Sequence, residues 1–266
     1  MIFDTHAHYD DKKFDDDRDS LLDSMKSHGI GLVTNVGSTV ETWDKIVELT
    51  EKYSFVYGTI GIHPSITEEL TDKNIERLRA YLDKEKIVAV GEIGLDYYWD
   101  KDHRQLQKEM FIKQLEIARE YQLPAVIHSR EGAADTFEII QEYGKDVTCM
   151  LHCFSYSSEQ ALEYVKKGHY IGICGVVTFA NGKKLKEVVR EIPLTSILLE
   201  TDAPYLSPEP RRGKRNDSRN LIYVAREVAN IKGVTAEEVI RQTYENGKAF
   251  FSINRTNKKK YPLITR

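Results

Sequence analysis

The sequence lacks the features that mark secreted and membrane proteins. Its 266 residues include three cysteines, an odd number with no Cys-x-x-Cys pair, which favours a reducing compartment over a disulfide framework. No apolar run approaches the ~20 residues that span a bilayer. The chain does not open with a basic segment followed by an apolar stretch, as a secretory signal would. We therefore expect a cytoplasmic protein with no membrane partner.

A strong excess of charge of one sign is also missing. The formal net charge is −4, so the composition as a whole does not indicate a polyanionic partner. Basic residues gather only late in the chain, at 211–215 and 258–260, and we interpret the second run as solvated surface. With 41% hydrophobic and 30% charged residues, the chain has ordinary globular composition and enough length for a large core.

What the sequence does contain is an alternation of two patterns. Short apolar, β-branched runs recur roughly every 20 to 35 residues, as βα units require. The stretches between them carry apolar residues at helical spacing, as Leu106, Met110, Phe111 and Leu115 do. The runs lie at 2–3, 31–36, 56–60, 87–90, 125–127, 147–151, 170–173 and 196–199. Eight strands alternating with helices predict a single (β/α)₈ TIM barrel over residues 1–266. A doubly wound open sheet is the alternative, weakened because no Gly-x-Gly-x-x-Gly follows any strand.

Histidines and acids follow these runs with unusual regularity. His6 and His8 come after the first run, one residue apart, so in an extended strand both point to the same face. Similar residues follow the third, fourth, fifth, sixth and eighth runs: His63, Glu92, His128, His152 and Asp202. In a barrel all of these positions share the C-terminal rim, where active sites form. Any one of these histidines alone would more often be structural, but together they predict a metal site.

Four imidazoles and two carboxylates make up the predicted ligand set: His6, His8, Glu92, His128, His152 and Asp202. A single catalytic zinc usually takes three protein ligands, so six ligands suit two divalent ions bridged by a carboxylate. Glu92 comes from a middle strand and is the better bridge. Asp202 ends the last strand, beside the first, where it can share an ion with His6 and His8 and accept a proton from water. Such mixed ligands suit zinc, manganese, nickel or cobalt, and two carboxylates allow magnesium.

The ordered set of motifs resembles the TatD family of metal-dependent deoxyribonucleases. The matching segments are 3–8 (FDTHAH), 61–64 (GIHP), 91–97 (GEIGLDY), 127–131 (IHSRE), 152–154 (HCF), 199–204 (LETDAP) and 212–216 (RGKRN). The resemblance implies a TIM-barrel hydrolase with two metal ions. It assigns one ion to His6, His8, Glu92 and Asp202, and the other to Glu92, His128 and His152. It also implies hydrolysis of DNA phosphodiesters, often of the 3′–5′ exonuclease kind, with single-stranded DNA or 3′ ends as the partner.

One departure from the family pattern is visible. The family usually carries Glu-Pro after the last matching segment, whereas this chain has Asp217 and Ser218. A loop without that proline is expected to be less rigid.

The predicted chemistry gives roles to further residues. A water activated by the metals attacks the phosphorus in line, with Asp202 and Glu92 as the catalytic carboxylates. Three more residues are expected to bind substrate. Arg130 can clamp a phosphate bidentately, with a salt bridge on the rim as an equal alternative. Lys214 and Arg215 follow the last strand, in a usual phosphate-binding region of barrels.

Other residues near these motifs are also given roles from the sequence alone, and for some of them two interpretations stay open. His63 either holds substrate or forms a hydrogen bond within the rim. Asp96 and Glu200 are expected to support ligands from behind. The aromatic residues at 97–99 can stack on bases, although a cluster that caps the barrel is the simpler interpretation.

Two other functions stay open from the sequence. A hydrolase of amides, lactones or aminoacyl esters would use the same chemistry at a carbonyl carbon, although the basic loop favours a phosphate substrate. A non-catalytic nucleic-acid-binding protein is the second alternative, but it would leave the ligand set without a role. Turnover of DNA that requires a divalent metal separates the nuclease from both.

Overall fold

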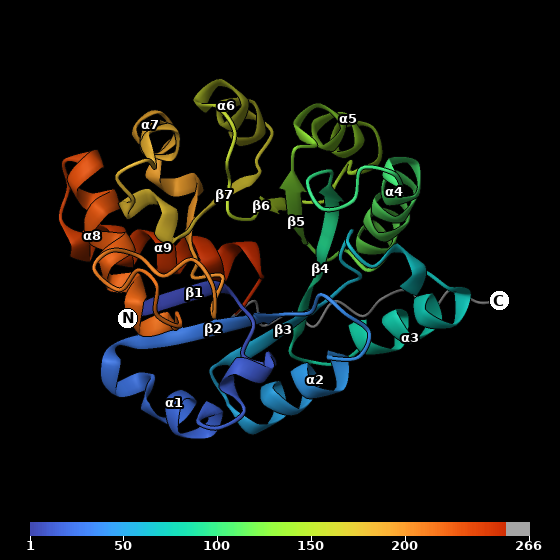
Figure 1. Cartoon of the computed structure of the whole chain (residues 1–266), viewed down its shortest axis with the longest axis horizontal. Helices are drawn as coiled ribbons and strands as arrows, with labels where there is room; N and C mark the ends of the chain where they lie inside the picture. The colour runs from blue at the N-terminus through green and yellow to red at the C-terminus, as the bar shows by residue number, and fades with distance from the viewer. Residues whose placement is uncertain (254–266) are drawn as a thin grey trace.

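Eight parallel strands form the sheet at the centre of the protein (Figure 1). The computed structural model describes residues 1–253, so the basic run at 258–260 lies outside the described residues. The strands are β1 (Ile2–Ala7), β2 (Ile30–Val36), β3 (Val56–Ile60), β4 (Ile87–Asp96), β5 (Ala125–Arg130), β6 (Cys149–Leu151), β7 (Tyr170–Ile173) and β8 (Ile197–Leu199). They pair in chain order from β1 to β8. The predicted TIM barrel is confirmed.

The contact between the first and last strands is made near the rim. Ala7 and Ala203 form a parallel bridge. The backbone N–H of His8 donates to the carbonyl oxygen of Ala203 (2.7 Å), and the N–H of Asp202 donates to that of His6 (2.9 Å). These bonds close the barrel and at the same time hold Asp202 beside His6 and His8 at the end of β1.

Helices cover the outside of the strands (Figure 1). They are α1 (Arg18–Ser24), α2 (Trp43–Lys52), α3 (Asp72–Leu82), α4 (Arg104–Glu120), α5 (Ala133–Tyr143), α6 (Ser158–Lys166), α7 (Lys183–Glu191), α8 (Leu221–Lys232) and α9 (Ala236–Phe250). In α4, Met110, Phe111 and Leu115 are buried as their spacing predicts, but Leu106, in the first turn, is 37% exposed. No helix in the described part of the chain has the length and apolar character that a membrane span requires.

Three strands run further than their apolar residues indicate. We expected the strands to end at residues 3, 90 and 127, but β1, β4 and β5 continue to Ala7, Asp96 and Arg130. The register of β4 against β5 shifts between Val90 and Ile93 and is then unbroken from Ile93 to Asp96, which lies opposite Arg130. Periodicity underestimates these strands because polar residues interrupt or end them. Those of β1 and β4 are buried, whereas β5 ends in half-buried His128 and Ser129 and exposed Arg130.

The barrel interior is apolar toward the N-terminal ends of the strands. Phe3, Met150 and Leu198 come from three different strands and pack together with Phe250 and Phe251 at the end of α9. The rings of Phe3 and Phe251 lie 5.7 Å apart. Residues from so many strands can meet only inside the barrel. This layer therefore closes the end opposite the rim.

Candidate metal centre

The histidines at the end of β1, His6 in the strand and His8 just after it, converge on one point. Because side chains alternate along a strand, His6 and His8 project to the same side, and their Nε2 atoms lie 3.1 Å apart. The Nδ1 of His8 is held by the carbonyl oxygen of Val36 on the neighbouring strand (2.8 Å). The ring of His8 is therefore fixed with its other nitrogen facing the centre of the barrel mouth.

Glu92 lies at the middle of the cluster. Its backbone N–H donates to Gly37 across the barrel mouth (2.7 Å). One carboxylate oxygen, Oε2, faces β1, at 3.6 Å from Nε2 of His6 and 3.9 Å from Nε2 of His8. The other oxygen, Oε1, faces the opposite side, at 2.9 Å from Nδ1 of His128. The carboxylate thus presents one oxygen to each half of the site, as a bridging ligand would.

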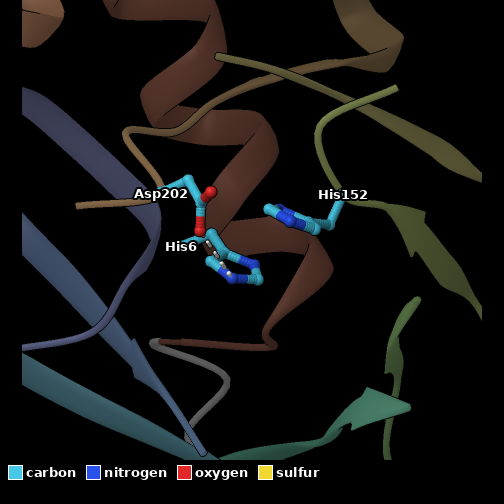
Figure 2. A group of neighbouring side chains, drawn as sticks. All are labelled: His6, His152 and Asp202. Atoms are coloured by element: carbon cyan, nitrogen blue, oxygen red, sulfur yellow. Dashed lines mark ion pairs between the residues drawn. The ribbon is translucent and has the colours of Figure 1, made fainter. Parts of the chain in front are cut away.

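Asp202 completes the half of the site that lies next to β1. It adopts a left-handed backbone conformation, with φ 56°, in the turn after β8. Its Oδ1 lies 3.4 Å from Nε2 of His8 and 3.8 Å from Nε2 of His6. Figure 2 shows Asp202 above His6, with the His152 ring beside them. The rings of His6 and His152 are stacked, with centroids 3.7 Å apart.

Carboxylates hold the histidines of the other half from behind. Nε2 of His128 contacts Oδ2 of Asp96 (3.0 Å), and Nδ1 of His152 contacts Oε2 of Glu200 (3.1 Å). Asp96 and Glu200 thus contact the two candidate ligands that they were expected to support. Such contacts set the ring orientation and tautomer of a ligating histidine and raise its basicity.

His63 joins this half of the site as well. Its Nε2 lies 3.9 Å from Oε1 of Glu92, and its ring packs against that of His128 at 4.4 Å. Its Nδ1 is bound to the hydroxyl of Ser65 (2.8 Å). His63 was expected to contact substrate or to form a hydrogen bond within the rim, and the structure places it beside Glu92 and His128, in a group that could also hold a metal ion.

The donor atoms suit divalent cations. Four groups of the described residues have ligand atoms within 4.8 Å of one another, and three of them consist of histidines and acids at the barrel mouth: His6, His152 and Asp202; His6, His8 and Glu92; and His63, Glu92 and His128. The fourth consists of Cys153, Cys174 and Glu200. Two of these groups share Glu92. Nδ1 of His6 is fully buried and has no hydrogen-bond partner among the described residues. Imidazole and carboxylate groups arranged in this way match the ligand preferences of zinc, manganese and related ions.

A cavity of about 550 Å³ opens directly over these groups. Its lining includes the candidate ligands His8, His63, His128, His152 and Asp202. This volume is in the range of small-molecule sites. The candidate ligands are therefore open to a substrate from the rim.

Comparison with known proteins places the chain in a family. The sequence profile of the family described as TatD related DNase matches residues 3–252. The chain belongs to this family. YabD, a metal-dependent hydrolase of Bacillus subtilis (strain 168), is 41% identical over 255 residues, which cover 96% of this chain and the whole of YabD. The human deoxyribonuclease TATDN3 is 31% identical over 265 residues, covering 94% of each chain.

A solved structure agrees with the assignment. The crystal structure of YjjV, a TatD homologue of Escherichia coli K12, matches with a TM-score of 0.89 at 29% identity, covering 95% of this chain and 98% of YjjV. The chain is thus a metal-dependent hydrolase of the TatD-related DNase family, as the motifs predicted.

Electrostatics in the TatD-related site couple proton and metal binding. Burial alone would raise the pKa of the Glu92 carboxyl, but the rings of His152 and His6 hold it well below its usual value. Burial would lower the pKa of His8, yet its contacts with Asp202 and Glu92 raise it to about 9. Before metal binds, the protonated imidazole of His8 therefore offsets the charge of the carboxylates that face it. A divalent cation must displace that proton.

The residues expected to bind phosphate lie differently. Arg215 forms a bidentate ion pair with Asp17, at 2.6 and 2.8 Å, and donates to the carbonyl oxygen of Lys13. Lys214 accepts a hydrogen bond from Ser207 at its backbone carbonyl. Arg130 forms no ion pair within the described residues, and its guanidinium instead stacks over the ring of Tyr98, 3.9 Å from the centroid. The structure does not gather these three cations around the cavity.

A buried network behind the site was not foreseen. Oδ2 of Asp4 accepts hydrogen bonds from the hydroxyls of Thr201 (2.7 Å) and Ser218 (2.6 Å), and the Ser218 hydroxyl also meets that of Tyr9 (2.7 Å). Burial raises the pKa of Asp4 to about 7. The loop that we expected to be less rigid is therefore fastened at Ser218. Asp4 and Ser218 are separated by more than 200 residues, so no local sequence signal links them.

Proposed function

We propose that this chain hydrolyses phosphodiester bonds of DNA, as a deoxyribonuclease of the 3′–5′ exonuclease kind that uses two divalent cations. The observation that carries the proposal is the position of Glu92, with Oε2 toward His6 and His8 and Oε1 toward His128 and His63. Membership of the TatD-related DNase family and the name of human TATDN3 support DNA as the substrate class.

Two cations in such a site would lower the pKa of a bound water and offset charge on the phosphoryl oxygens. The residues of the chain supply the rest. Asp202 is the better proton acceptor, because its side chain is 17% exposed toward the cavity whereas that of Glu92 is 4% exposed. Oδ1 of Asp202 takes the proton of the attacking water. His63, at the open edge, is placed to contact a substrate oxygen.

The expected state of His63 agrees with this role. Burial lowers its pKa to about 3, so the ring is neutral at physiological pH. With Nδ1 bound to Ser65, its Nε2 is left to face Glu92 and the cavity. Because Nδ1 accepts the backbone N–H of Ser65 (3.2 Å), the proton of the neutral ring lies on Nε2, which can donate a hydrogen bond to a substrate oxygen.

A time course on end-labelled single-stranded DNA tests the proposal. With the divalent ions magnesium, manganese, zinc, nickel and cobalt each supplied in turn, we expect nucleotides to be released from the 3′ end. His128→Ala should abolish the release, while the variant of an exposed histidine, His28→Ala, should not. A panel containing RNA, aminoacyl esters and amides runs beside it. Turnover of esters or amides alone, with DNA left intact under every metal, would contradict the nuclease assignment.

A further inference from the structure

Two large aromatic side chains stand exposed on the rim beside the site. Tyr98 is 45% exposed and Trp99 is 71% exposed, directly after β4, the strand that carries Glu92. Their rings meet edge to face, 4.9 Å apart. The third aromatic residue of this segment, Tyr97, is 3% exposed and donates its hydroxyl hydrogen to Asp135. Tyr97 therefore packs in the barrel wall, whereas Tyr98 and Trp99 do not.

The exposed pair is tied to the metal centre through a single carboxylate. Oδ1 of Asp96 accepts the backbone N–H groups of both Tyr98 and Trp99, each at 3.0 Å. Oδ2 of the same residue contacts Nε2 of His128. One side chain thus sets the position of a candidate metal ligand and of the aromatic pair. The distance between them does not depend on a flexible loop.

A cation completes the surface. Arg130 lies opposite Asp96 in the β4–β5 register, and its guanidinium lies 3.9 Å from the centroid of Tyr98 and 5.6 Å from that of Trp99. No carboxylate oxygen of the described residues lies within ion-pair distance of it. Aromatic faces next to an unpaired guanidinium match a nucleotide, which carries a flat base and an anionic phosphate.

The side of the cavity formed by the segments after β1, β2 and β8 is less suited to a polyanion. Tyr205, after β8, is also exposed, but its hydroxyl donates to the carboxylate of Asp11 (3.0 Å). Acidic side chains of Asp10, Asp11 and Glu41 line the cavity on this side. The charge distribution therefore favours a path in which the DNA leaves the cavity over the ends of β4 and β5.

We propose that Tyr98, Trp99 and Arg130 form a stacking subsite for a nucleobase of single-stranded DNA next to the cleaved bond. The subsite, which rests on the proposed function, holds the unpaired base on the aromatic faces and the following phosphate on the guanidinium. A base within a duplex has both faces covered by its neighbours. The subsite accordingly selects unpaired ends.

Steady-state kinetics of the metal-loaded enzyme test the subsite. Trp99→Ala should raise KM for a thymidine oligonucleotide about 5- to 100-fold and leave kcat within about twofold, because stacking contributes to binding rather than to the chemical step. Trp99→Phe should restore most of the loss. Arg130→Lys should still raise KM relative to the wild type, since lysine keeps the charge but not the planar stack. Leu106→Ala, another exposed apolar side chain, is the matched control.

A second readout follows the base directly. The chain has two tryptophans, and Trp43 is fully buried. Rapid mixing with the oligonucleotide should quench the fluorescence of the wild type and of Trp43→Phe, but not that of Trp99→Phe. An oligomer of the same length made of abasic sites should cause no quenching, and Trp99→Ala should not change its KM.

The outcomes separate the two proposals. Unchanged KM in Trp99→Ala and in Tyr98→Ala, with DNA cleavage intact, would overturn the subsite and leave the nuclease assignment standing. If the wild type cleaves no DNA under any divalent ion, both proposals fail together.

Discussion

At the N-terminal ends of the strands the barrel interior holds Phe3, Met150 and Leu198, and a few residues further along the chain it holds His6, His152 and Asp202. The first group needs only complementary shapes, because apolar side chains gain free energy simply by leaving water. Each member of the second group needs a charged or polar partner, since burying a charge without one is costly. The same strands thus divide stability and chemistry between their two ends.

The largest effect is expected at Glu92, the carboxylate that faces both halves of the metal centre at the barrel mouth. Glu92→Gln removes the charge that faces both halves of the site, so we expect DNA hydrolysis to fall about 10³-fold or more. Elemental analysis should show fewer than two ions bound per chain. Glu131→Gln, an exposed acid on the same rim, should behave as the wild type does. If Glu92→Gln hydrolyses DNA within tenfold of the wild-type rate, the chemistry does not depend on the charged residues of the barrel mouth.

The apolar end should respond in the opposite way. Phe3 is 2% exposed and packs against Phe251, so Phe3→Ala leaves a cavity and should lower the free energy of unfolding by about 3–5 kcal/mol. The kcat of the molecules that remain folded should stay close to that of the wild type. Urea denaturation and kinetics at low temperature measure the two quantities. A fall in kcat with little loss of stability would show that the two ends are not separate.

A histidine at the apolar end offers a sharper contrast, because it is held neutral. His169 precedes β7 and accepts the N–H of Cys149 (3.2 Å), and burial lowers its pKa to about 4. The unfolded chain, with an ordinary histidine pKa near 6.5, binds more protons between these values. Folding stability is therefore complete above pH 6.5 and is lost as the pH falls toward 4.

The contribution of His169 to the pH dependence of stability is measured by comparing the wild type with His169→Gln. From pH 7 to pH 4 the stability of the wild type should fall by about 3 kcal/mol relative to His169→Gln, in urea denaturation at each pH. The exposed His28→Gln serves as the control for titration elsewhere. A stability difference that does not change with pH would mean that His169 is not buried in its neutral form.

The supporting carboxylate of the mouth should give the smallest effect. Asp96→Asn keeps the size of the side chain but removes the charge behind His128, so we expect metal affinity to fall about 10- to 100-fold. Calorimetric titration with manganese measures it, while the unfolding free energy of the metal-free protein should change little. No change in affinity would show that His128 does not need its partner.

The sequence predicted the strands and the candidate ligands because both follow local rules. Apolar runs of suitable spacing indicate a barrel, and His128 and Asp202 were recognisable because each directly follows such a run. The full length of β4 was not predictable in the same way. Glu92 and Asp96 are polar but buried, and burial of a polar residue depends on partners that lie elsewhere in the chain.

The contacts of the basic loop after β8 could not be predicted from the sequence for the same reason. Arg215 resembles a phosphate-binding residue in sequence, yet it pairs with Asp17, 198 positions away. Ser218 was expected to loosen the loop, but it bonds to Asp4. Such contacts are decided by the closure of the barrel, which brings the segment after β8 against β1 and the segment that follows it.

Crystals grown with manganese offer the most direct measurement of the central claim, through anomalous scattering. Two peaks should appear about 3.5–4 Å apart, on either side of the Glu92 carboxylate, one beside His6 and His8 and the other beside His128. A single peak, or peaks that do not contact Glu92, would contradict the shared-carboxylate centre from which the hydrolytic function is argued.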